Sequence, residues 1–137
     1  MEYLGHYDVE TGRKQPLKEH LDHVASLAAQ FAASFDAEEL GEIAGRYHDV
    51  GKYSARFQEY LRGVRSSGGD HSTGGAQLLY QKGQPLLCLA AWAIAGHHGG
   101  LPDFGGAFDG EGSATFCGRM RKPLPDFSAW QEDERAS

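Results

Sequence analysis

Apolar residues recur at helical spacing near the start of the chain. A first amphipathic helix is predicted from about residue 16 to residue 35, because apolar positions follow a period of about 3.6 residues. These positions are Leu17, Leu21, Val24, Leu27, Ala28, Phe31 and Phe35. Pro16 suits the first turn of this helix. His20 borders the apolar stripe, whereas His23 lies toward the polar side, so the pattern favours His20 as the inward-facing histidine.

A second helix is predicted directly after the first. Asp36 followed by Glu39 resembles a capping box, in which two side chains satisfy the free N–H groups of a helix start. The apolar positions that follow end at His48 and Asp49. Gly51 then interrupts the helical pattern.

Three more helices are predicted before residue 100, over about residues 54–62, 70–81 and 86–96. The last is apolar on nearly every side and is therefore expected to be central. From 101 to about 125, glycines and single prolines dominate and no strand pattern is found, which predicts loop. The fold class predicted is all-α: a compact helical bundle in a single domain (1–137), with a helical core (1–100) and a loop-rich C-terminal segment (101–137).

Composition limits the function. With 40% hydrophobic residues the chain can form a core, and a net charge of −6 argues against a broad nucleic-acid-binding face. Cys88 and Cys117 form no CxxC pair, which favours a reducing compartment. The start lacks a signal-peptide pattern, and the longest apolar stretch is too short to cross a bilayer. We therefore expect a cytoplasmic protein without a membrane partner.

Candidate chemistry centres on an adjacent dyad, His48 and Asp49, with other histidines at wide intervals. Taken singly, each histidine has an ordinary explanation, such as a hydrogen-bonded core residue or a cation at a helix C-terminus. Five of the seven histidines, however, fall at predicted helix boundaries or on an inner face. Imidazoles combined with a carboxylate bind divalent transition metals and leave positions open for water, so the combination favours a metal site.

These motifs resemble a known family. His20 followed by His-Asp-x-Gly-Lys at 48–52 resembles the HD superfamily of metal-dependent phosphohydrolases. Two further stretches, Asp-His-Ser-Thr-Gly-Gly-Ala at 70–76 and His-His-Gly-Gly-Leu-Pro-Asp at 97–103, are similar to one branch of it. That branch is the nuclease domain of the type I CRISPR-associated helicase–nuclease. The resemblance covers residues 2–130, nearly the whole chain.

The resemblance implies a role for each matching residue. A first metal would be bound by His20, His48 and Asp49. A second would be bound by Asp49, His71, His97 and His98, with Asp49 bridging the two metals. Lys52 would neutralise charge on the scissile phosphate, the alternative being an ordinary surface lysine. Ser72 and Thr73 would orient His71 or contact a phosphate oxygen, although helix capping explains them equally well.

The resemblance also implies cofactors and partners. One or two divalent transition-metal ions are expected, with Fe, Mn, Co or Ni favoured over Mg because the ligands are rich in imidazole. The expected substrate is single-stranded DNA, degraded in antiviral defence. The expected partners are the CRISPR helicase domain and the RNA-guided surveillance complex.

The chain departs from the family pattern near its end. The family has a late aspartate on a downstream helix, and residues 131–135 resemble only the beginning of such a helix before Ser137. None of the remaining candidates stands in the expected motif: Asp103, Asp109, Asp126 and Asp133. We therefore expect a truncated C-terminal part and a first metal site that is weak or open to water.

Two alternatives remain beside the nuclease. One is a nucleotide phosphohydrolase of the same superfamily, which the acidic charge suits. The other is a non-catalytic relative that binds the surveillance complex. A basic cluster formed by Arg119, Arg121 and Lys122 would guide DNA in the nuclease reading, although charged side chains commonly have no partner but solvent.

Overall fold

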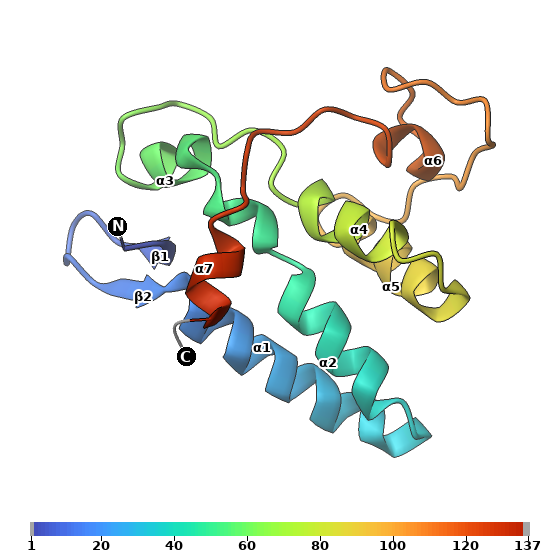
Figure 1. The fold of residues 1–137 in the computed structure, drawn as a ribbon. Coiled ribbons are helices and arrows are strands. Elements are labelled where there is room, and N and C mark those ends of the chain that lie inside the picture. Colours follow the sequence, from blue (N-terminus) through green and yellow to red (C-terminus); the bar gives the residue numbers. More distant parts are fainter. Residues whose placement is uncertain (1, 136–137) are drawn as a thin grey trace.

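The structure is a computed structural model that describes residues 2–135, apart from the side chains of Phe35 and Arg135. It is mostly helical, which confirms the predicted fold class (Figure 1). The helices are α1 (Leu17–Ala32), α2 (Glu38–Tyr47), α3 (Ala55–Leu61), α4 (Thr73–Tyr80), α5 (Pro85–Gly96), α6 (Phe116–Arg119) and α7 (Trp130–Arg135). Two 3-10 turns, η1 (Ala33–Phe35) and η2 (Val50–Tyr53), follow α1 and α2.

Helices α1 and α2 lie side by side and run in opposite directions (Figure 1). Glycines on α2 allow their backbones to approach closely. A Cβ atom added at Gly41 would lie 2.5 Å from the carbonyl oxygen of Ala28, and one at Gly45 would lie 2.7 Å from that of Val24. Both distances are shorter than real Cβ contacts, so a larger residue at either position would force the two helices apart.

The turn between α1 and α2 differs from the prediction. Asp36 does not cap α2: it adopts the left-handed conformation, with φ of 57°, and donates its backbone N–H to Ala33. Ala37 takes the N-cap position and makes no side-chain cap. The capping-box prediction was wrong because η1 extends α1 by one turn, and the reversal then falls on Asp36 itself. The side chain of Phe35, predicted for the apolar stripe of α1, lies outside the described residues.

Two hydrophobic clusters form the core. The larger joins α4, α5 and α6, and its buried members are Ala76, Leu79, Ala90, Ala91, Ile94, Ala95, Phe116 and Cys117. The smaller joins α1 and η2, and its buried members are Leu17, Leu21, Val50 and Tyr53. Tyr47 packs against both clusters. Because His48 and Asp49 follow Tyr47 directly, the dyad lies where the two clusters meet.

A small antiparallel hairpin, β1 (Leu4–Tyr7) and β2 (Lys14–Pro16), contradicts the prediction that the chain has no strand. The strands are too short and polar for a periodic pattern, and a tertiary contact holds them. Buried Gln58 of α3 accepts from the N–H of Leu4 at 2.9 Å and donates to its carbonyl at 2.9 Å. The hairpin also lies against α1, where a Cβ atom added at Gly5 would be 3.1 Å from the His20 Cβ.

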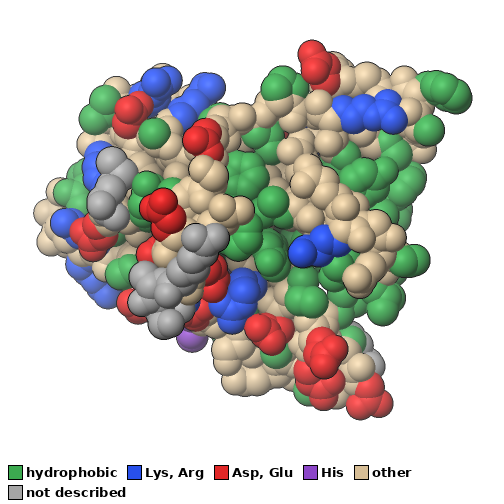
Figure 2. Space-filling view, in the orientation of Figure 1, with side chains coloured by type: hydrophobic (Ala, Val, Ile, Leu, Met, Phe, Trp, Pro, Cys, Tyr) green, Lys and Arg blue, Asp and Glu red, His purple; other side chains and the backbone are tan. Residues whose placement is uncertain are grey.

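Helix α5 is less central than predicted. Its buried side, with Ala91 and Ile94, faces the core, but Leu86 and Leu89 are 63% and 56% exposed. Leu89 lines an open apolar groove together with residues of α1 and α2 such as Leu27. Figure 2 shows apolar side chains across the middle and right of one face of the molecule. Within the described part of the chain, no helix has the length and hydrophobicity to cross a bilayer.

The segment after α5 is mostly loop, with two short helices. Its last helix, α7, lies beside the beginning of α1 (Figure 1). Trp130 packs edge-on against Tyr47, with ring centroids 5.9 Å apart, and the Tyr53 hydroxyl donates to Asp133 at 2.5 Å. This helix therefore closes over the smaller core cluster.

Candidate metal centre

The residues predicted to bind metal converge around one carboxylate, that of Asp49. The imidazoles brought to it are His20 of α1, His48 at the end of α2, His71 ahead of α4, and His97 and His98 at the end of α5. Neighbouring rings in this set have centroids 4.0–5.4 Å apart. We call these five histidines and Asp49 the histidine cluster.

Each oxygen of Asp49 faces its own pair of imidazoles. Oδ2 lies 3.2 Å from Nε2 of His20 and 3.1 Å from Nε2 of His48. Oδ1 lies 3.3 Å from Nε2 of His97 and 3.9 Å from Nε2 of His98. The carboxylate thus belongs to two ligand groups, the His20 group (His20, His48, Asp49) and the His97 group (Asp49, His97, His98).

Backbone carbonyls fix the tautomer of two of these imidazoles. Nδ1 of His48 lies 2.5 Å from the carbonyl oxygen of Gly45, and Nδ1 of His97 lies 2.5 Å from that of Ile94. A carbonyl oxygen only accepts, so each Nδ1 carries a proton, and Nε2 of the neutral ring then presents its lone pair. Such an outward Nδ1–H bond is the usual partner of a metal-binding histidine.

The cluster therefore fits a cation. In the neutral rings, the Nε2 lone pairs of His48 and His97 point at the oxygens of Asp49. Two hydrogen-bond acceptors that face each other repel, and a cation bound between them would stabilise the arrangement. Oδ1 of Asp49 is also buried and has no hydrogen-bond donor among the described residues. Donor atoms bound to one ion at about 2.0–2.1 Å lie roughly 2.9–3.4 Å apart, and most of the separations around Asp49 fall in this range.

His71 joins the cluster from the side of His98. The two Nε2 atoms are 3.0 Å apart, and the ring of His71 packs on Phe57 with centroids 4.6 Å apart. The backbone of His71 lies against Gly51, where an added Cβ would be 2.2 Å from the His71 carbonyl oxygen. The glycine of the His-Asp-x-Gly-Lys motif thus allows the His71 segment to reach the cluster.

Electrostatics keep the carboxylate charged. Burial alone would raise the pKa of Asp49, whose side chain is only 6% exposed, but contacts with His20, His48 and His97 outweigh burial and hold the pKa well below its usual range. Contact with Asp49 raises the pKa of His97, against the effect of burial. Protons and metal ions therefore compete for this imidazole.

The imidazoles at the far side of the cluster favour the neutral form. Burial lowers the pKa of His71, and the neighbouring His98 adds to this effect. Burial lowers the pKa of His98, and the charge of His97 is the second-largest cause in the same direction. A neutral ring is the form that binds metal, so both residues are suited to be ligands near neutral pH.

Comparison with known families agrees with this geometry. A model of the HD domain matches residues 17–124. The chain belongs to the HD domain family. The match includes the whole histidine cluster, and membership of this family indicates a metal-dependent phosphohydrolase. No curated protein matches the chain in sequence.

In this HD domain, Lys52 faces the dyad and is not an ordinary surface lysine. Its side chain is 14% exposed, and Nζ lies 3.0 Å from Oδ2 of Asp49 and 3.4 Å from the carbonyl oxygen of Gly5. The ammonium therefore stands at the edge of the His20 group, where an anionic substrate would meet a positive charge.

Ser72 and Thr73 are engaged inside the HD domain. Thr73 is fully buried, and its hydroxyl donates to Asp70 at 2.6 Å and accepts from Arg119 at 2.7 Å. Ser72 is 8% exposed and accepts from Arg119 at 3.2 Å. A phosphate would have to displace these partners, so the geometry supports the positioning of the His71 segment rather than direct substrate contact.

The basic cluster near the C-terminus is likewise occupied. Arg119 binds Thr73 and Ala95, Arg121 donates to the carbonyl oxygen of Asp109 at 2.7 Å, and Lys122 pairs with Asp70 at 2.9 Å. These cations hold loops together, so the idea that they guide DNA finds no support in their contacts.

The candidate late aspartates do not join the histidine cluster. Asp133 accepts from Tyr53, Asp109 accepts from Thr115 at 2.6 Å, and Asp126 accepts from the N–H of Ser128 at 2.9 Å. In the described part of the chain, none of these three, nor Asp103, belongs to either ligand group. The His20 group is therefore made by three protein side chains.

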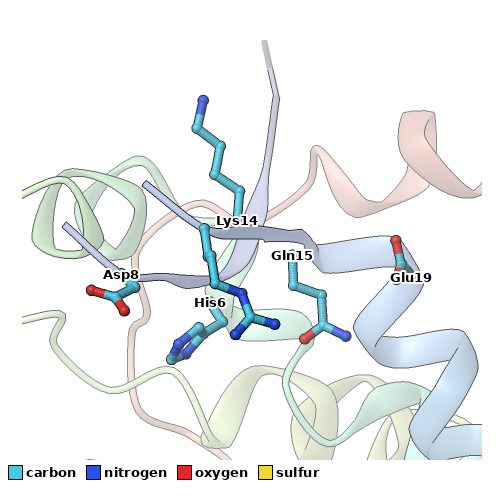
Figure 3. Close-up of a pocket in the computed structure, with 6 residues that line it drawn as sticks. His6, Asp8, Lys14, Gln15 and Glu19 are labelled. Carbon is cyan, nitrogen blue, oxygen red and sulfur yellow. The ribbon is translucent and has the colours of Figure 1, made fainter. Parts of the chain in front are cut away.

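A polar pocket between the hairpin and the first turn of α1 was not foreseen from the sequence. It measures about 420 Å³, and its lining includes His6 and Gln15 of the hairpin and Glu19, the neighbour of His20. Figure 3 shows His6 and Gln15 on one side of the hairpin and Lys14 directed to the other. Only the strand pairing places these residues together, since the sequence carries no strand signal there.

Proposed function

We propose that this HD domain is a metal-dependent nuclease that hydrolyses phosphodiester bonds of single-stranded DNA. The observation that carries the proposal is the carboxylate of Asp49, whose two oxygens face two separate groups of imidazoles. Metal ions about 3.5–4 Å apart that share a ligand are the usual arrangement for phosphodiester hydrolysis. On the motif resemblance we extend the proposal to a role in type I CRISPR defence, with the helicase domain and the RNA-guided surveillance complex as partners and the cytoplasm as compartment.

Each residue of the cluster has a task in the proposal. His20, His48 and Asp49 would hold one ion, and Asp49, His71, His97 and His98 would hold the other. Bound ions would supply a nucleophile at neutral pH and offset charge on the phosphoryl group. Lys52, at the edge of the His20 group, would pair with a non-bridging oxygen of the substrate once metal neutralises Asp49.

The ligand chemistry favours transition-metal ions. Five imidazoles and one carboxylate form the cluster, and imidazole suits Fe, Mn, Co and Ni better than it suits Mg, which prefers oxygen. The carbonyls of Gly45 and Ile94 would keep His48 and His97 in the ligand form.

The position of the cluster favours a polymer substrate. The side chain of His98 is 53% exposed, so the His97 group lies at the surface rather than in an enclosed pocket. A strand can pass across such a site without threading an end into it. Arg119, Arg121 and Lys122 are engaged inside the protein and offer little positive charge to DNA phosphates. The affinity for DNA would therefore depend on the bound ions and on delivery of the strand by the helicase partner.

A nucleotide phosphohydrolase is the second candidate. The net charge of −6 and the internal pairing of Arg119, Arg121 and Lys122 favour a small phosphate ester over a long polyanion. The polar pocket lined by His6, Gln15 and Glu19 would then accept part of the nucleotide.

The test is hydrolysis by the purified protein supplied with Mn, Co, Ni or Mg. Labelled single-stranded DNA, duplex DNA and a set of nucleotides are assayed in parallel. His20→Ala and His23→Ala form a matched pair, because both histidines lie on α1 but only His20 contacts Asp49, while His23 is exposed. Metal-dependent cutting of single strands that His20→Ala abolishes and His23→Ala retains is the expected result.

Other outcomes separate the alternatives. Hydrolysis of nucleotides without cutting of DNA would replace the nuclease with the second candidate. A folded protein that binds metal, hydrolyses neither substrate and still binds the surveillance complex would be the non-catalytic relative. Equal activity of the two histidine variants would contradict the assigned site.

A further inference from the structure

In the proposed second metal site, His71 completes the His97 group, and the segments that carry these histidines lie far apart in the sequence. His71 lies ahead of α4, whereas His97 and His98 follow α5, yet Nε2 of His71 and Nε2 of His98 are 3.0 Å apart. Packing of α4 on α5 brings the helices together, but apolar packing is non-directional. A hydrogen-bonded contact near the two helix ends would fix this separation more precisely.

Arg119 of α6 makes that contact. Its Nη1 donates to the carbonyl oxygen of Ala95 at 2.6 Å, two residues before His97. Its Nη2 donates to the hydroxyls of Thr73 at 2.7 Å and Ser72 at 3.2 Å, and Ser72 directly follows His71. One guanidinium therefore connects the ends of both histidine-bearing segments.

The surroundings hold Arg119 itself in place. Helix α6 begins with a side-chain cap from Thr115, and its Phe116 is fully buried in the larger core cluster. Gln77 of α4 donates to the carbonyl oxygen of Arg119 at 2.9 Å. The guanidinium thus starts from a fixed backbone, which is what a spacer between two segments requires.

A carboxylate completes this arrangement. Asp70 accepts from the Thr73 hydroxyl at 2.6 Å and from Lys122 at 2.9 Å, and also receives the backbone N–H of Thr73 at 3.1 Å. Asp70 thereby orients the hydroxyl so that its lone pairs face Arg119. The planar fork of arginine serves acceptors on two segments at once, which a lysine ammonium does poorly.

We propose that Arg119 is a positioning residue that sets the separation of His71 from His97 and His98, and thereby the affinity of the His97 group for a divalent ion. The inference rests on the proposed function, since it concerns the second metal of that site. Arg119 touches none of the proposed ligands and acts only through Ala95, Ser72 and Thr73.

The test measures metal binding rather than turnover. Wild-type protein is stripped of metal and titrated with Mn²⁺ by calorimetry, with the thermal midpoint recorded for every variant. Arg119→Met removes the guanidinium. Arg121→Met is the matched control, because Arg121 also donates to backbone carbonyls, those of Asp109 and Ala107, in a loop without histidines. Thr73→Val keeps the shape of the side chain and removes the hydroxyl that Arg119 contacts.

We expect two binding events in the wild type and in Arg121→Met. In Arg119→Met one event should weaken at least tenfold while the other stays within twofold, because the His20 group has no contact with Arg119. Thr73→Val should show the same asymmetry in milder form, and it decides the matter if Arg119→Met does not fold.

The outcomes distinguish the two claims. A folded Arg119→Met that binds both ions as the wild type does would refute the positioning role and leave the proposed function intact. Equal weakening of both events would reduce Arg119 to general stabilisation of the fold and also refute it. A wild type that binds no divalent ion would refute the proposed function and, with it, this inference.

Discussion

Replacing Gly51 by alanine tests how the dyad and His71 are assembled. In the structure a Cβ atom at this position would lie 2.2 Å from the carbonyl oxygen of His71, and 2.7 Å and 2.8 Å from its carbonyl carbon and Cα. Real Cβ atoms essentially never approach closer than 3.0 Å, and all three neighbours are backbone atoms. The backbone conformation of Gly51 is open to any residue, so the effect of the methyl group is purely steric.

The methyl group must push the His71 segment away by most of an ångström. Overpacking of this kind costs about 1–3 kcal/mol of folding free energy. The functional cost is larger, because displacement of a site residue by about 1 Å can reduce activity on the order of 100-fold. We therefore expect Gly51→Ala to fold with reduced stability and to lose most of the metal affinity of the proposed second site, in which His71 completes the His97 group.

The assay is chemical denaturation together with Mn²⁺ titration. Gly99→Ala is the matched control: it lies next to His98, and a Cβ atom there would meet no heavy atom within 4 Å. The free energy of unfolding of this control should lie within about 0.5 kcal/mol of the wild-type value, because the added methyl group meets no neighbour. Wild-type stability and metal binding in Gly51→Ala would refute the close approach of His71 to the motif glycine.

Three further predictions concern stability. Burial would raise the pKa of Asp70, but hydrogen bonds from Thr73 and Lys122 outweigh it and lower the pKa from 3.8 to about 2, so Asp70 adds stability above pH 3.8 that is lost as the pH falls through 2. Asp70→Asn should lower the free energy of unfolding by about 2 kcal/mol at pH 7. Measured by urea denaturation, that free energy should depend less on pH between pH 5 and 2 in the variant than in the wild type, and an equal dependence would contradict the prediction. Phe116→Ala should cost about 3–5 kcal/mol in the same assay, because the side chain is fully buried in the larger core cluster, and a loss below 1 kcal/mol would show that the core is not packed around it. Removing metal with a chelator should lower the thermal midpoint of unfolding, since an ion present at about 100 times its dissociation constant adds roughly 2.7 kcal/mol to the stability of the folded state. In Asp49→Asn the midpoint should no longer depend on metal. A wild-type midpoint that the chelator does not change would count against a metal site.

The helices and the composition of the cluster followed from the sequence because both are local signals. The periodic apolar positions of α1 reflect a helix that buries one face, and the same periodicity separates His20 from exposed His23. Gly63 and Gly83, both with positive φ, end α3 and α4 near the predicted places. The residue types at 48–52 and 97–98 indicated metal chemistry without any knowledge of where the segments meet.

The hairpin and the end of α1 were missed because tertiary contacts decide them. Strand β1 is held by the buried side chain of Gln58, 54 positions away in the sequence. Residues 4–16 show no alternation of apolar and polar positions that would predict a strand. The sequence around Asp36 predicts a helix cap, but the reversal of the chain after η1 requires the left-handed backbone conformation at this position.

The sequence alone determined that this chain is a helical protein with an imidazole-rich candidate metal site, because helix formation and ligand chemistry depend on residue type and spacing. Only the tertiary structure decided how the candidate ligands divide over the two oxygens of Asp49, and that the buried hydroxyl of Thr73 bonds to Arg119. It also explained Gly51, whose missing side chain admits the backbone of His71. These features depend on distances between segments that no local pattern encodes.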